Sequence, residues 1–305
     1  MDLFLSNGRT YTDADLRDSL SRLGLRDSTV LVYSRFLSFG RPLRPDAVQR
    51  VLQVLVDEVG PHGTLCVPSY TFSGYRGEPF DAQQSKSLVG VLGEVARTSA
   101  GFARTVHPVY STSCYGPDAV RLVNQNPRTC FGPGSWFDLF TTSPNARILM
   151  LGTNLNAVTL AHHYDQRFSA PGRFLKRFRG RLKDGGDEIE IEFDSFVKDD
   201  AYYEGRVPCV GRLDAIAELF GVIERAECLG DWAHSIREED FRDLYGAGIQ
   251  VGPDYFLTTS LEEYEDYYEK NQFRRFFGAL PEDYVEAMRR LFQRSGRLNT
   301  PSGQA

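Results

Sequence analysis

The stretch that decides the fold joins the apolar run Arg147-Ile-Leu-Met-Leu-Gly152 to Thr159-Leu-Ala-His-His-Tyr-Asp165. The first part predicts a buried strand. If a helix begins after it, Thr159, His162 and Asp165 lie three residues apart and share one face. Open α/β sheets commonly place ligand sites at the mouth of a strand. The pattern therefore predicts a hydroxyl, an imidazole and a carboxylate on one wall of a site.

Two interpretations of His162 stay open from spacing alone. A histidine oriented by a carboxylate is suited to general base catalysis, but a helical histidine is more often a packed or surface residue. A metal site made of His162, His163 and Asp165 is disfavoured, because adjacent helical side chains diverge by about 100°. No cysteine or second histidine pair with ligand spacing lies nearby. We therefore expect no metal, and we expect His163 to point away from the site.

Composition limits the class of protein. The chain has 305 residues, 41% of them hydrophobic, enough to build a sizeable core in one large domain. A net charge of −6 argues against a nucleic-acid partner, which would usually require basic patches. The mild acidity fits a cationic substrate, and it also fits ordinary solubility.

The cysteines and the first residues indicate the compartment. The five cysteines are scattered and form no C-x-x-C motif, which favours a reducing compartment. The segment Met1–Leu5 lacks the basic region and long apolar core of a signal peptide. No apolar run reaches the length of a membrane span. We expect a cytoplasmic protein without a membrane partner.

Strand and helix patterns alternate in the first half of the chain. A helix is expected over 11–23, with Thr12 and Asp15 in a capping-box arrangement. Strands 29–33 and 63–68, the helix 46–59 between them, and helices 88–97 and 117–125 follow. This alternation predicts a layered α/β architecture.

The character of the sequence changes after Pro171. A basic run, Arg173–Lys183, precedes Asp187–Phe193, where charged and apolar residues alternate as in a strand with one wet face. Its acidic face is interpreted as a solvated sheet edge protected by charge. Helices are expected over 213–219, 261–277 and 280–294. We divide the chain into a core, 1–170, a C-terminal helical part of the same domain, 171–297, and a disordered tail, 298–305.

Twelve landmarks over about residues 10–210 agree in order and spacing with one family. They are Leu23-Gly-Leu25, Val30–Ser34, Phe39-Gly40, Val59–Leu65, Pro68–Ser73, Phe80-Asp81, Gly90-x-x-Gly-Glu94, His107-Pro-x-x-Ser111, Gly116-Pro117, Phe131-Gly-x-x-Ser135, Leu149-x-Leu-Gly152 and Thr159-x-x-His-x-x-Asp165. On these residues the chain resembles the aminoglycoside N-3 acetyltransferases, also called antibiotic N-acetyltransferases.

The resemblance implies a layered α/β/α domain with a smaller acceptor-binding part near the C-terminus. It implies acyl transfer from acetyl-CoA, or another short acyl-CoA, to an amine of an aminoglycoside or amino sugar, with His162 as general base. Residues 1–170 would then hold the acyl-CoA, and 171–297 would bind the acceptor, a small-molecule amine. A homodimer is left open.

The same resemblance assigns a CoA site to three segments. They are the loop after the first strand, the 69–73 segment and the 111–113 strand. The residues concerned are Ser34, Arg35, Ser69, Thr71, Phe72, Ser73, Ser111 and Ser113. Ser34 and Arg35 leave a strand where they can face phosphates, although a plain surface role for Arg35 is an equal alternative.

Further side chains fit the implied chemistry. Thr159 can donate to the thioester oxygen as negative charge develops there, or can simply pack at the helix start. Four carboxylates are candidates for binding a cationic acceptor, although each alone is more typical of a solvated surface. They are Asp81, Asp194, Asp199 and Asp200.

Departures from the family pattern leave alternatives open. The family's usual His-Ser-Ser after the first strand is Tyr33-Ser34-Arg35 here, and its usual glutamate is Asp165. The shorter carboxylate leaves contact with His162 open. The alternatives are acylation of a biosynthetic or cell-surface amino sugar, or a non-catalytic acyl-CoA- or sugar-binding homologue. A Cys114 or Cys130 nucleophile is disfavoured, because no adjacent base follows from the sequence.

Overall fold

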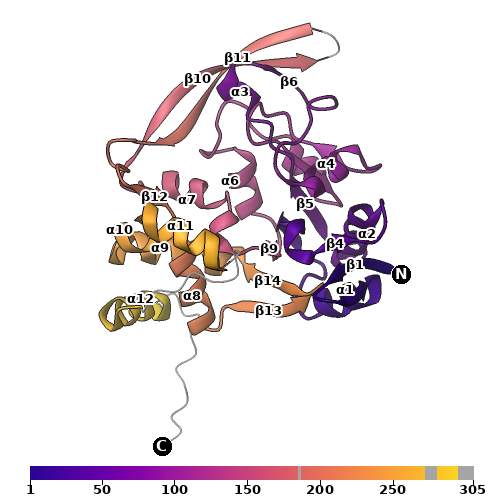
Figure 1. The fold of residues 1–305 in the computed structure, drawn as a ribbon. Helices are drawn as coiled ribbons and strands as arrows, with labels where there is room; N and C mark the ends of the chain where they lie inside the picture. Colours follow the sequence, from indigo (N-terminus) through magenta and orange to yellow (C-terminus); the bar gives the residue numbers. More distant parts are fainter. Residues whose placement is uncertain (185–186, 272–279, 295–305) are drawn as a thin grey trace, which may run out of the picture.

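A seven-stranded mixed sheet forms the centre of the computed structural model, which describes residues 1–184, 187–271 and 280–294 (Figure 1). Its strand order is β13-β14-β9-β3-β5-β8-β7, and β3 runs parallel to both β9 and β5. The strands are β3 (Thr29–Ser34), β5 (Thr64–Pro68), β7 (Ala103–Arg104), β8 (Thr112–Tyr115), β9 (Arg147–Leu151), β13 (Ile223–Cys228) and β14 (Asp231–Arg237).

Both faces of this sheet are buried. In β3, Val30 and Val32 join one hydrophobic core, whereas Leu31 and Tyr33 join the other, because successive side chains in a strand point to opposite faces. All five residues of β9 are buried in the same way. Strands covered on both faces read as continuous apolar runs, which is why the sequence predicted them.

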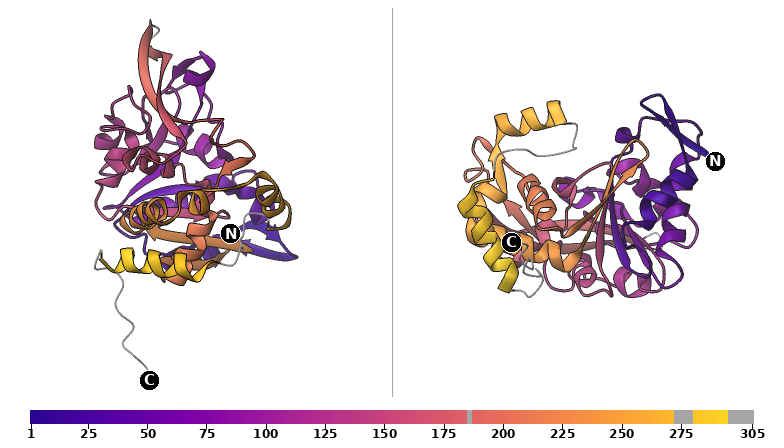
Figure 2. Two further views of the ribbon diagram at one scale, coloured as in Figure 1. Left: turned by 90° about the vertical axis from the view of Figure 1, so that its left-hand side faces the viewer. Right: turned by 90° about the horizontal axis from the view of Figure 1, so that it is seen from below.

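Helices cover the two faces. On one face lie α1 (Asp13–Ser21), α2 (Ala47–Val59) and α4 (Gly90–Thr98), and their apolar residues share a core with the sheet. The other core includes residues of α5 (Ala119–Val123), α6 (Trp136–Thr141), α7 (Ala161–Arg167), α8 (Gly211–Leu219), α9 (Glu238–Val251), α10 (Pro253–Phe256) and α12 (Glu282–Arg294). Figure 2 shows this arrangement from two further directions. The predicted α/β/α layering is confirmed.

The predicted start of the first helix is also confirmed. Thr12 Oγ1 accepts a hydrogen bond from the Asp15 backbone N at 3.2 Å, and Asp15 Oδ2 accepts one from the Thr12 backbone N at 2.7 Å. These two bonds form a capping box. The residues around this helix form a small sheet that was not predicted: β1 (Asp2–Ser6), β2 (Arg9–Thr12) and β4 (Arg41–Pro42).

A long hairpin projects from the body of the molecule (Figure 2). It consists of β10 (Arg173–Asp184) and β11 (Asp187–Lys198), and β10 also pairs with β6 (Pro79–Asp81). The predicted strand over 187–193 is therefore confirmed as an edge strand. The basic run is its partner, and charges pair across the hairpin, for example Arg177 with Asp194 at 2.9 Å. The segment between β5 and α4 contains β6 and a short helix, α3 (Ser73–Arg76).

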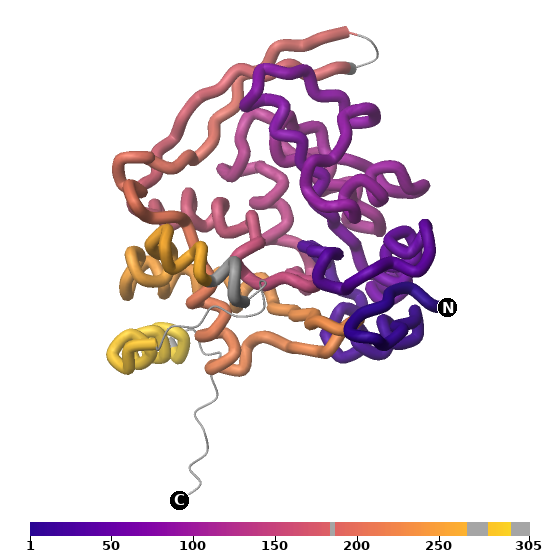
Figure 3. Tube along the Cα trace, viewed as in Figure 1, coloured from indigo at the N-terminus to yellow at the C-terminus, as the bar shows by residue number. Residues whose placement is uncertain are grey.

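The C-terminal part is more than a set of helices. β13 and β14 extend the main sheet beside β9, and Ser19 Oγ of α1 donates to the Glu227 carbonyl at 2.6 Å. In the trace of Figure 3, the β13–β14 hairpin lies beside α1, although the two are far apart in the sequence. β12 (Arg206–Pro208) pairs with β15 (Thr258–Ser260), which leads into α11 (Leu261–Asn271).

Two expectations cannot be compared with the structure. The tail 298–305, and residues 272–277 of the expected helix 261–277, lie outside the described residues. Within the described part, no helix combines the length and apolar character needed to cross a membrane.

Candidate active site

The site forms where the chain leaves β9. The Asn154 side chain accepts a hydrogen bond from the Asn156 backbone N at 3.1 Å and caps a short 3₁₀ helix, η2 (Leu155–Ala157). α7 then begins at Ala161. Asn154 thus caps the 3₁₀ turn, and Thr159 precedes α7 instead of lying within it.

His162 is paired with a buried carboxylate. Its Nδ1 lies 2.9 Å from Asp165 Oδ2, so the shorter aspartate reaches the ring directly. Asp165 Oδ1 accepts a hydrogen bond from the Tyr245 hydroxyl at 2.5 Å, and Arg173 Nε lies 3.0 Å from Oδ2. Since a carboxylate accepts the Nδ1 proton, Nε2 is left as the free base. The His162 side chain remains 33% exposed, so this nitrogen can meet a ligand.

His163 is excluded from the site, as predicted. Its ring is buried, and Nδ1 lies 2.7 Å from the Phe131 carbonyl oxygen. Burial lowers the pKa of His163 below its usual value, so the ring is neutral near pH 7. It packs the helix against the segment before α6.

Three cavities lie along the wall that carries Thr159 and His162. The strand-end cavity, about 230 Å³, is lined by Val32, Tyr33, Ser34, Val67, Pro68, Tyr70, Phe72, Val89, Gly90, Gly93, Ala157 and Thr159. The middle cavity, about 100 Å³, is lined by Asn156, Ala157, Val158, Thr159, Ala161, His162, Asp165, Arg173, Tyr203, Pro208, Cys209, Val210, Tyr245 and Leu257. The hairpin cavity, about 330 Å³, is lined by Tyr75, Tyr110, Phe131, His162, Arg173, Phe178, Ser195, Phe196, Val197, Lys198 and Pro208.

Shared residues show how these cavities connect. Ala157 and Thr159 line both the strand-end and the middle cavity. His162, Arg173 and Pro208 line both the middle and the hairpin cavity. Thr159, His162 and Asp165 thus share one wall, as the spacing predicted, and His162 stands between two spaces that could each hold a reactant.

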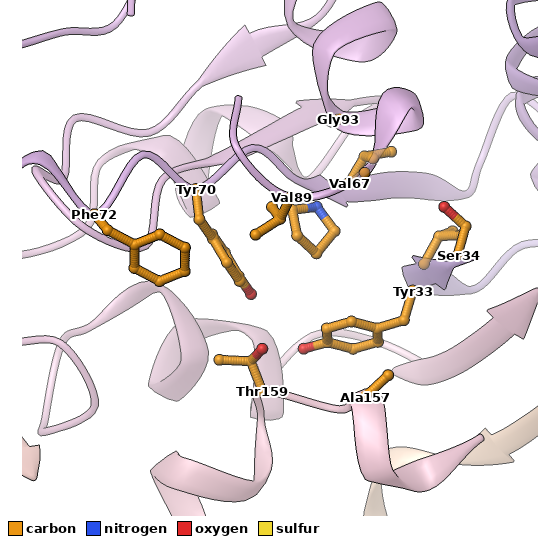
Figure 4. Close-up of a pocket in the computed structure, with 12 residues that line it drawn as sticks. Tyr33, Ser34, Val67, Tyr70, Phe72, Val89, Gly93, Ala157 and Thr159 are labelled. Atoms are coloured by element: carbon orange, nitrogen blue, oxygen red, sulfur yellow. The ribbon is translucent and has the colours of Figure 1, made fainter. Parts of the chain in front are cut away.

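Three hydroxyl groups converge in the strand-end cavity, those of Tyr33, Tyr70 and Thr159 (Figure 4). The Tyr33 hydroxyl accepts a hydrogen bond from the Leu160 backbone N at 3.2 Å. The buried Tyr70 hydroxyl lies near those of Tyr33 and Thr159, but within the described residues it makes no hydrogen bond of regular geometry. Burial raises the pKa of Tyr33 and of Tyr70 well above the usual value. Both groups therefore remain protonated donors at neutral pH.

Two of the residues predicted to bind CoA line this cavity, Ser34 and Phe72. Arg35 follows Ser34, and its guanidinium donates to Ser38 Oγ at 3.3 Å. The glycine landmark beside them has a steric cause, since a Cβ at Gly93 would lie 2.2 Å from the Pro68 carbonyl oxygen. Glycine there lets α4 approach the end of β5.

Five further residues that were predicted to bind CoA lie inside the protein: Ser69, Thr71, Ser73, Ser111 and Ser113. Ser69 Oγ lies 2.8 Å from Ser113 Oγ, and Ser111 Oγ donates to the Ser69 carbonyl at 2.8 Å. Thr71 Oγ1 donates to the Pro108 carbonyl at 3.2 Å and accepts from the backbone N of the buried Ser73. These hydroxyls tie the β5 exit to β8 and the segment before it, and they do not line the cavity.

The four acidic candidates also lie away from the cavities around His162. Asp194 is paired with Arg177 at 2.9 Å, and the exposed Asp200 with Lys198 at 2.9 Å. Asp199 and Asp81 accept hydrogen bonds from nearby backbone N–H groups in turns. None of these four residues lines the middle or the hairpin cavity.

Other chemistries find little support. All five cysteines are buried as free thiols, and burial raises the pKa of Cys130 to about 12, which disfavours a thiolate nucleophile. In residues 1–184, 187–271 and 280–294 no group of three or more histidine, cysteine or acidic residues could hold a metal ion.

Among the site residues that were not predicted are Tyr70, Arg173 and Tyr245. Tyr245 approaches Asp165 from 80 residues further along the chain, so no local spacing could reveal it. Arg173 was seen only as the first member of a basic run. Tyr70 lies within the 69–73 segment, where its neighbours Ser69, Thr71, Phe72 and Ser73 were predicted to bind CoA instead.

Comparison with known proteins identifies the family. The family model for aminoglycoside 3-N-acetyltransferase matches residues 31–214. Aminoglycoside N(3)-acetyltransferase VII of Streptomyces paromomycinus is 27% identical over 214 residues, 63% of this chain and 73% of that protein. Enzyme VIII of Streptomyces fradiae is 28% identical over 207 residues, 61% and 71% of the two chains.

Solved structures show the same fold. The aminoglycoside acetyltransferase AAC(3)-Xa superposes with a TM-score of 0.68 at 21% identity, over 81% of this chain and 94% of that one. AAC-IIIb bound to CoASH gives 0.66 at 21% identity, over 79% and 96%. The sequence resemblance is thus confirmed, and the chain belongs to the aminoglycoside 3-N-acetyltransferase family of acyltransferases.

Proposed function

We propose that the protein transfers a short acyl group, normally acetyl, from coenzyme A to an amine of a small molecule, with His162 as general base. The observation that carries this proposal is the His162–Asp165 pair at the junction of the cavities. A carboxylate on Nδ1 fixes the orientation and the tautomer of the ring, so that the lone pair of Nε2 faces the cavities. The formed pair favours an active enzyme over a non-catalytic homologue.

The reaction needs one proton removed from the nucleophile. In the proposed step Nε2 of His162 takes the amine proton while the amine nitrogen bonds to the thioester carbonyl carbon. The carbon–sulfur bond then breaks, and CoA leaves as a thiolate that takes up a proton. A thiol pKa of about 8.5 makes that leaving group good without a strong acid. General base catalysis of this kind typically contributes about 10²–10⁴-fold.

Negative charge develops on the thioester oxygen during attack. Thr159 lies on the wall shared by the strand-end and middle cavities, next to His162. Tyr70 presents a protonated hydroxyl to the same space. We assign these two hydroxyls as donors to that oxygen, since preorganised donors stabilise such charge.

The strand-end cavity suits the CoA arm. Its wall combines apolar groups such as Val67, Val89 and Phe72 with Ser34 at the carboxyl end of β3, where open α/β sheets bind ligands. Arg35 follows at the exit and can pair with phosphates. The relative AAC-IIIb, whose structure holds CoASH, shares this fold.

The hairpin cavity would then receive the acceptor, because β10, β11 and β12 of the 171–297 part supply much of its wall. Relatives of this fold are described as bound to sisomicin or in complex with a gentamicin. Aminoglycosides and simpler amino sugars therefore belong in the panel of acceptors to test.

CoA release tests the proposal directly. Purified protein is mixed with acetyl-CoA, a chelator and a panel of amines, and free CoA is measured with a thiol reagent. We expect amine-dependent release that the chelator does not change and that His162→Ala nearly abolishes. Binding of acetyl-CoA without release by any amine would support the non-catalytic homologue instead.

A further inference from the structure

Aromatic rings line the hairpin cavity from the hairpin to His162. Phe178 lies 4.9 Å from Tyr75, measured between ring centroids, and Tyr75 lies 6.2 Å from Tyr110. Tyr110 lies 4.8 Å from Phe131, whose ring lies 5.5 Å from that of His162. Most of these rings are only partly buried, so a ligand in the cavity meets their faces and edges.

The charged groups on the same wall are cationic or basic. Arg173 and Lys198 line the cavity together with His162, and among the described residues none that lines it carries a carboxylate. The nearest acid, Asp165, already serves His162, Tyr245 and Arg173. Asp200 pairs with Lys198, but its own side chain is 86% exposed and lies outside the wall.

Such a wall fits few ammonium groups. Each cationic group moved from water into a cavity without a carboxylate loses hydration, and an aromatic face offsets only part of that loss. Two cationic groups, Arg173 and Lys198, already stand at this wall, and the carboxylates that pair with them, Asp165 and Asp200, lie off it. A ring or other flat apolar body gains contact with Tyr75, Tyr110 and Phe178 instead. An anionic substituent on that body would meet Lys198, whose side chain is 55% exposed.

We infer, building on the acyl transfer proposed above, that the acceptor is a monoamine on an aromatic or similarly apolar body, neutral or anionic elsewhere. A polycationic amino sugar does not match this wall. A cavity of about 330 Å³ accommodates a compact ligand of one or two rings, near the lower end of ordinary ligand sites.

Three amines with the same ring test the charge preference: 3-(aminomethyl)benzoate, benzylamine and 1,3-bis(aminomethyl)benzene. They carry a negative, no, or a second positive substituent, and sisomicin serves as the polycationic reference. We expect kcat/KM to fall in the order given, with at least about tenfold between the first and third. A higher kcat/KM for the diamine or for sisomicin than for the benzoate would overturn the inference.

Lys198→Glu tests the source of the preference. Reversal of this charge should reduce the benzoate-to-diamine ratio at least about tenfold or invert it. Lys183→Glu is the matched control, since Lys183 is an exposed hairpin residue paired with Glu188 at 3.8 Å and does not line the cavity. An equal change in both variants would point to the overall field and contradict a specific contact.

Binding measurements separate this inference from the proposed reaction. Calorimetry with the three ring amines ranks their affinities without turnover. If the affinities follow the expected order but no amine causes CoA release, the inferred ligand class holds and the acyl transfer is rejected. If CoA is released but the affinities and kcat/KM follow the inverse order, the acyl transfer holds and the inferred ligand class is rejected.

Discussion

Asp165 Oδ2 lies 2.9 Å from Nδ1 of His162, one turn earlier in α7. The i, i+3 spacing places both side chains on one helical face, but other elements fix the pair. Tyr245 from α9 and Arg173 from β10 hold the carboxylate. The imidazole is thereby oriented by three elements, and its Nε2 is left for the cavities.

His162→Ala should lower kcat by about 10²–10⁴-fold near pH 7, the usual contribution of a general base. The loss should shrink at high pH, because a free amine no longer needs a base. The pH profile of kcat measures this, and calorimetry should show unchanged affinity for acetyl-CoA.

His62→Ala is the matched control for this variant. His62 is exposed in the turn between α2 and β5, so its loss should leave kcat unchanged at every pH. Near wild-type turnover in His162→Ala at neutral pH would remove His162 from the mechanism.

Asp165→Asn should lower both activity and stability. The amide no longer favours the required tautomer of His162, so kcat should fall. The Arg173 side chain, only 7% exposed, would lose its counterion, and breaking a buried pair in this way costs about 3–5 kcal/mol. Urea unfolding and kcat measure the two effects. Asp165→Glu keeps the charge and should retain more activity than the amide.

Asp194→Asn separates a buried pair from an exposed one. It breaks the contact with Arg177, whose side chain is 65% exposed, and should change the free energy of unfolding by no more than about 1 kcal/mol. Equal destabilisation by the two amide variants would show that burial of Asp165 does not matter.

The parts of the fold predicted from sequence are those whose pattern matches their burial. β3, β5 and β9 each contain an uninterrupted apolar run because both faces are covered. β14 was missed because it buries His234 and Ser235. α9 was missed because it buries two acidic residues of its first turn, Glu238 and Asp240. Buried polar groups hide the hydrophobic period.

The candidate site shows the same limit at the level of single hydroxyls. The Thr159–Asp165 spacing predicted a shared wall, because local geometry alone determines it. Ser69 and Ser113 were expected to face CoA, yet their hydroxyls pair with each other. Whether these hydroxyls face a cavity or a neighbouring strand depends on the pairing of β5 with β8. That pairing cannot be inferred from the sequence of either strand alone.

Tyr70→Phe should reduce kcat without loss of stability. The change removes only a hydroxyl that makes no hydrogen bond of regular geometry in the described part of the chain, and it keeps the ring contact with Tyr110. Loss of one oxyanion donor typically costs about 10²–10³ in kcat. Steady-state kinetics and thermal unfolding measure the two quantities.

Tyr115→Phe controls for removal of a tyrosine hydroxyl. Tyr115 ends β8, is 36% exposed and does not line the strand-end cavity, so its variant should keep wild-type kcat. An unchanged kcat in Tyr70→Phe would reject the assigned donor role and leave Thr159 as the candidate.

His107 couples the cavity wall to pH. The ring is buried, and its Nδ1 accepts hydrogen bonds from the backbone N of Val109 at 3.1 Å and of Tyr110 at 3.0 Å. Protonation of Nδ1 would remove both bonds beside Tyr110, which lines the hairpin cavity. Burial lowers the pKa of His107 from 6.5 to about 3.

The sign of the effect on stability follows from that pKa. Above pH 6.5 the ring is neutral in both the folded and the unfolded chain, so its burial costs nothing extra. Below 6.5 the unfolded chain takes up a proton that the folded chain refuses until about pH 3, so acid favours unfolding. Between pH 7.5 and pH 5 this single group should lower the free energy of unfolding by about 2 kcal/mol.

His107→Asn, whose Oδ1 can accept the same two hydrogen bonds, should reduce the fall in the free energy of unfolding, measured with urea, by about that amount. His62→Asn, an exposed histidine, should leave the fall unchanged. Identical pH dependence in the wild type and His107→Asn would show that His107 is not the group that resists protonation.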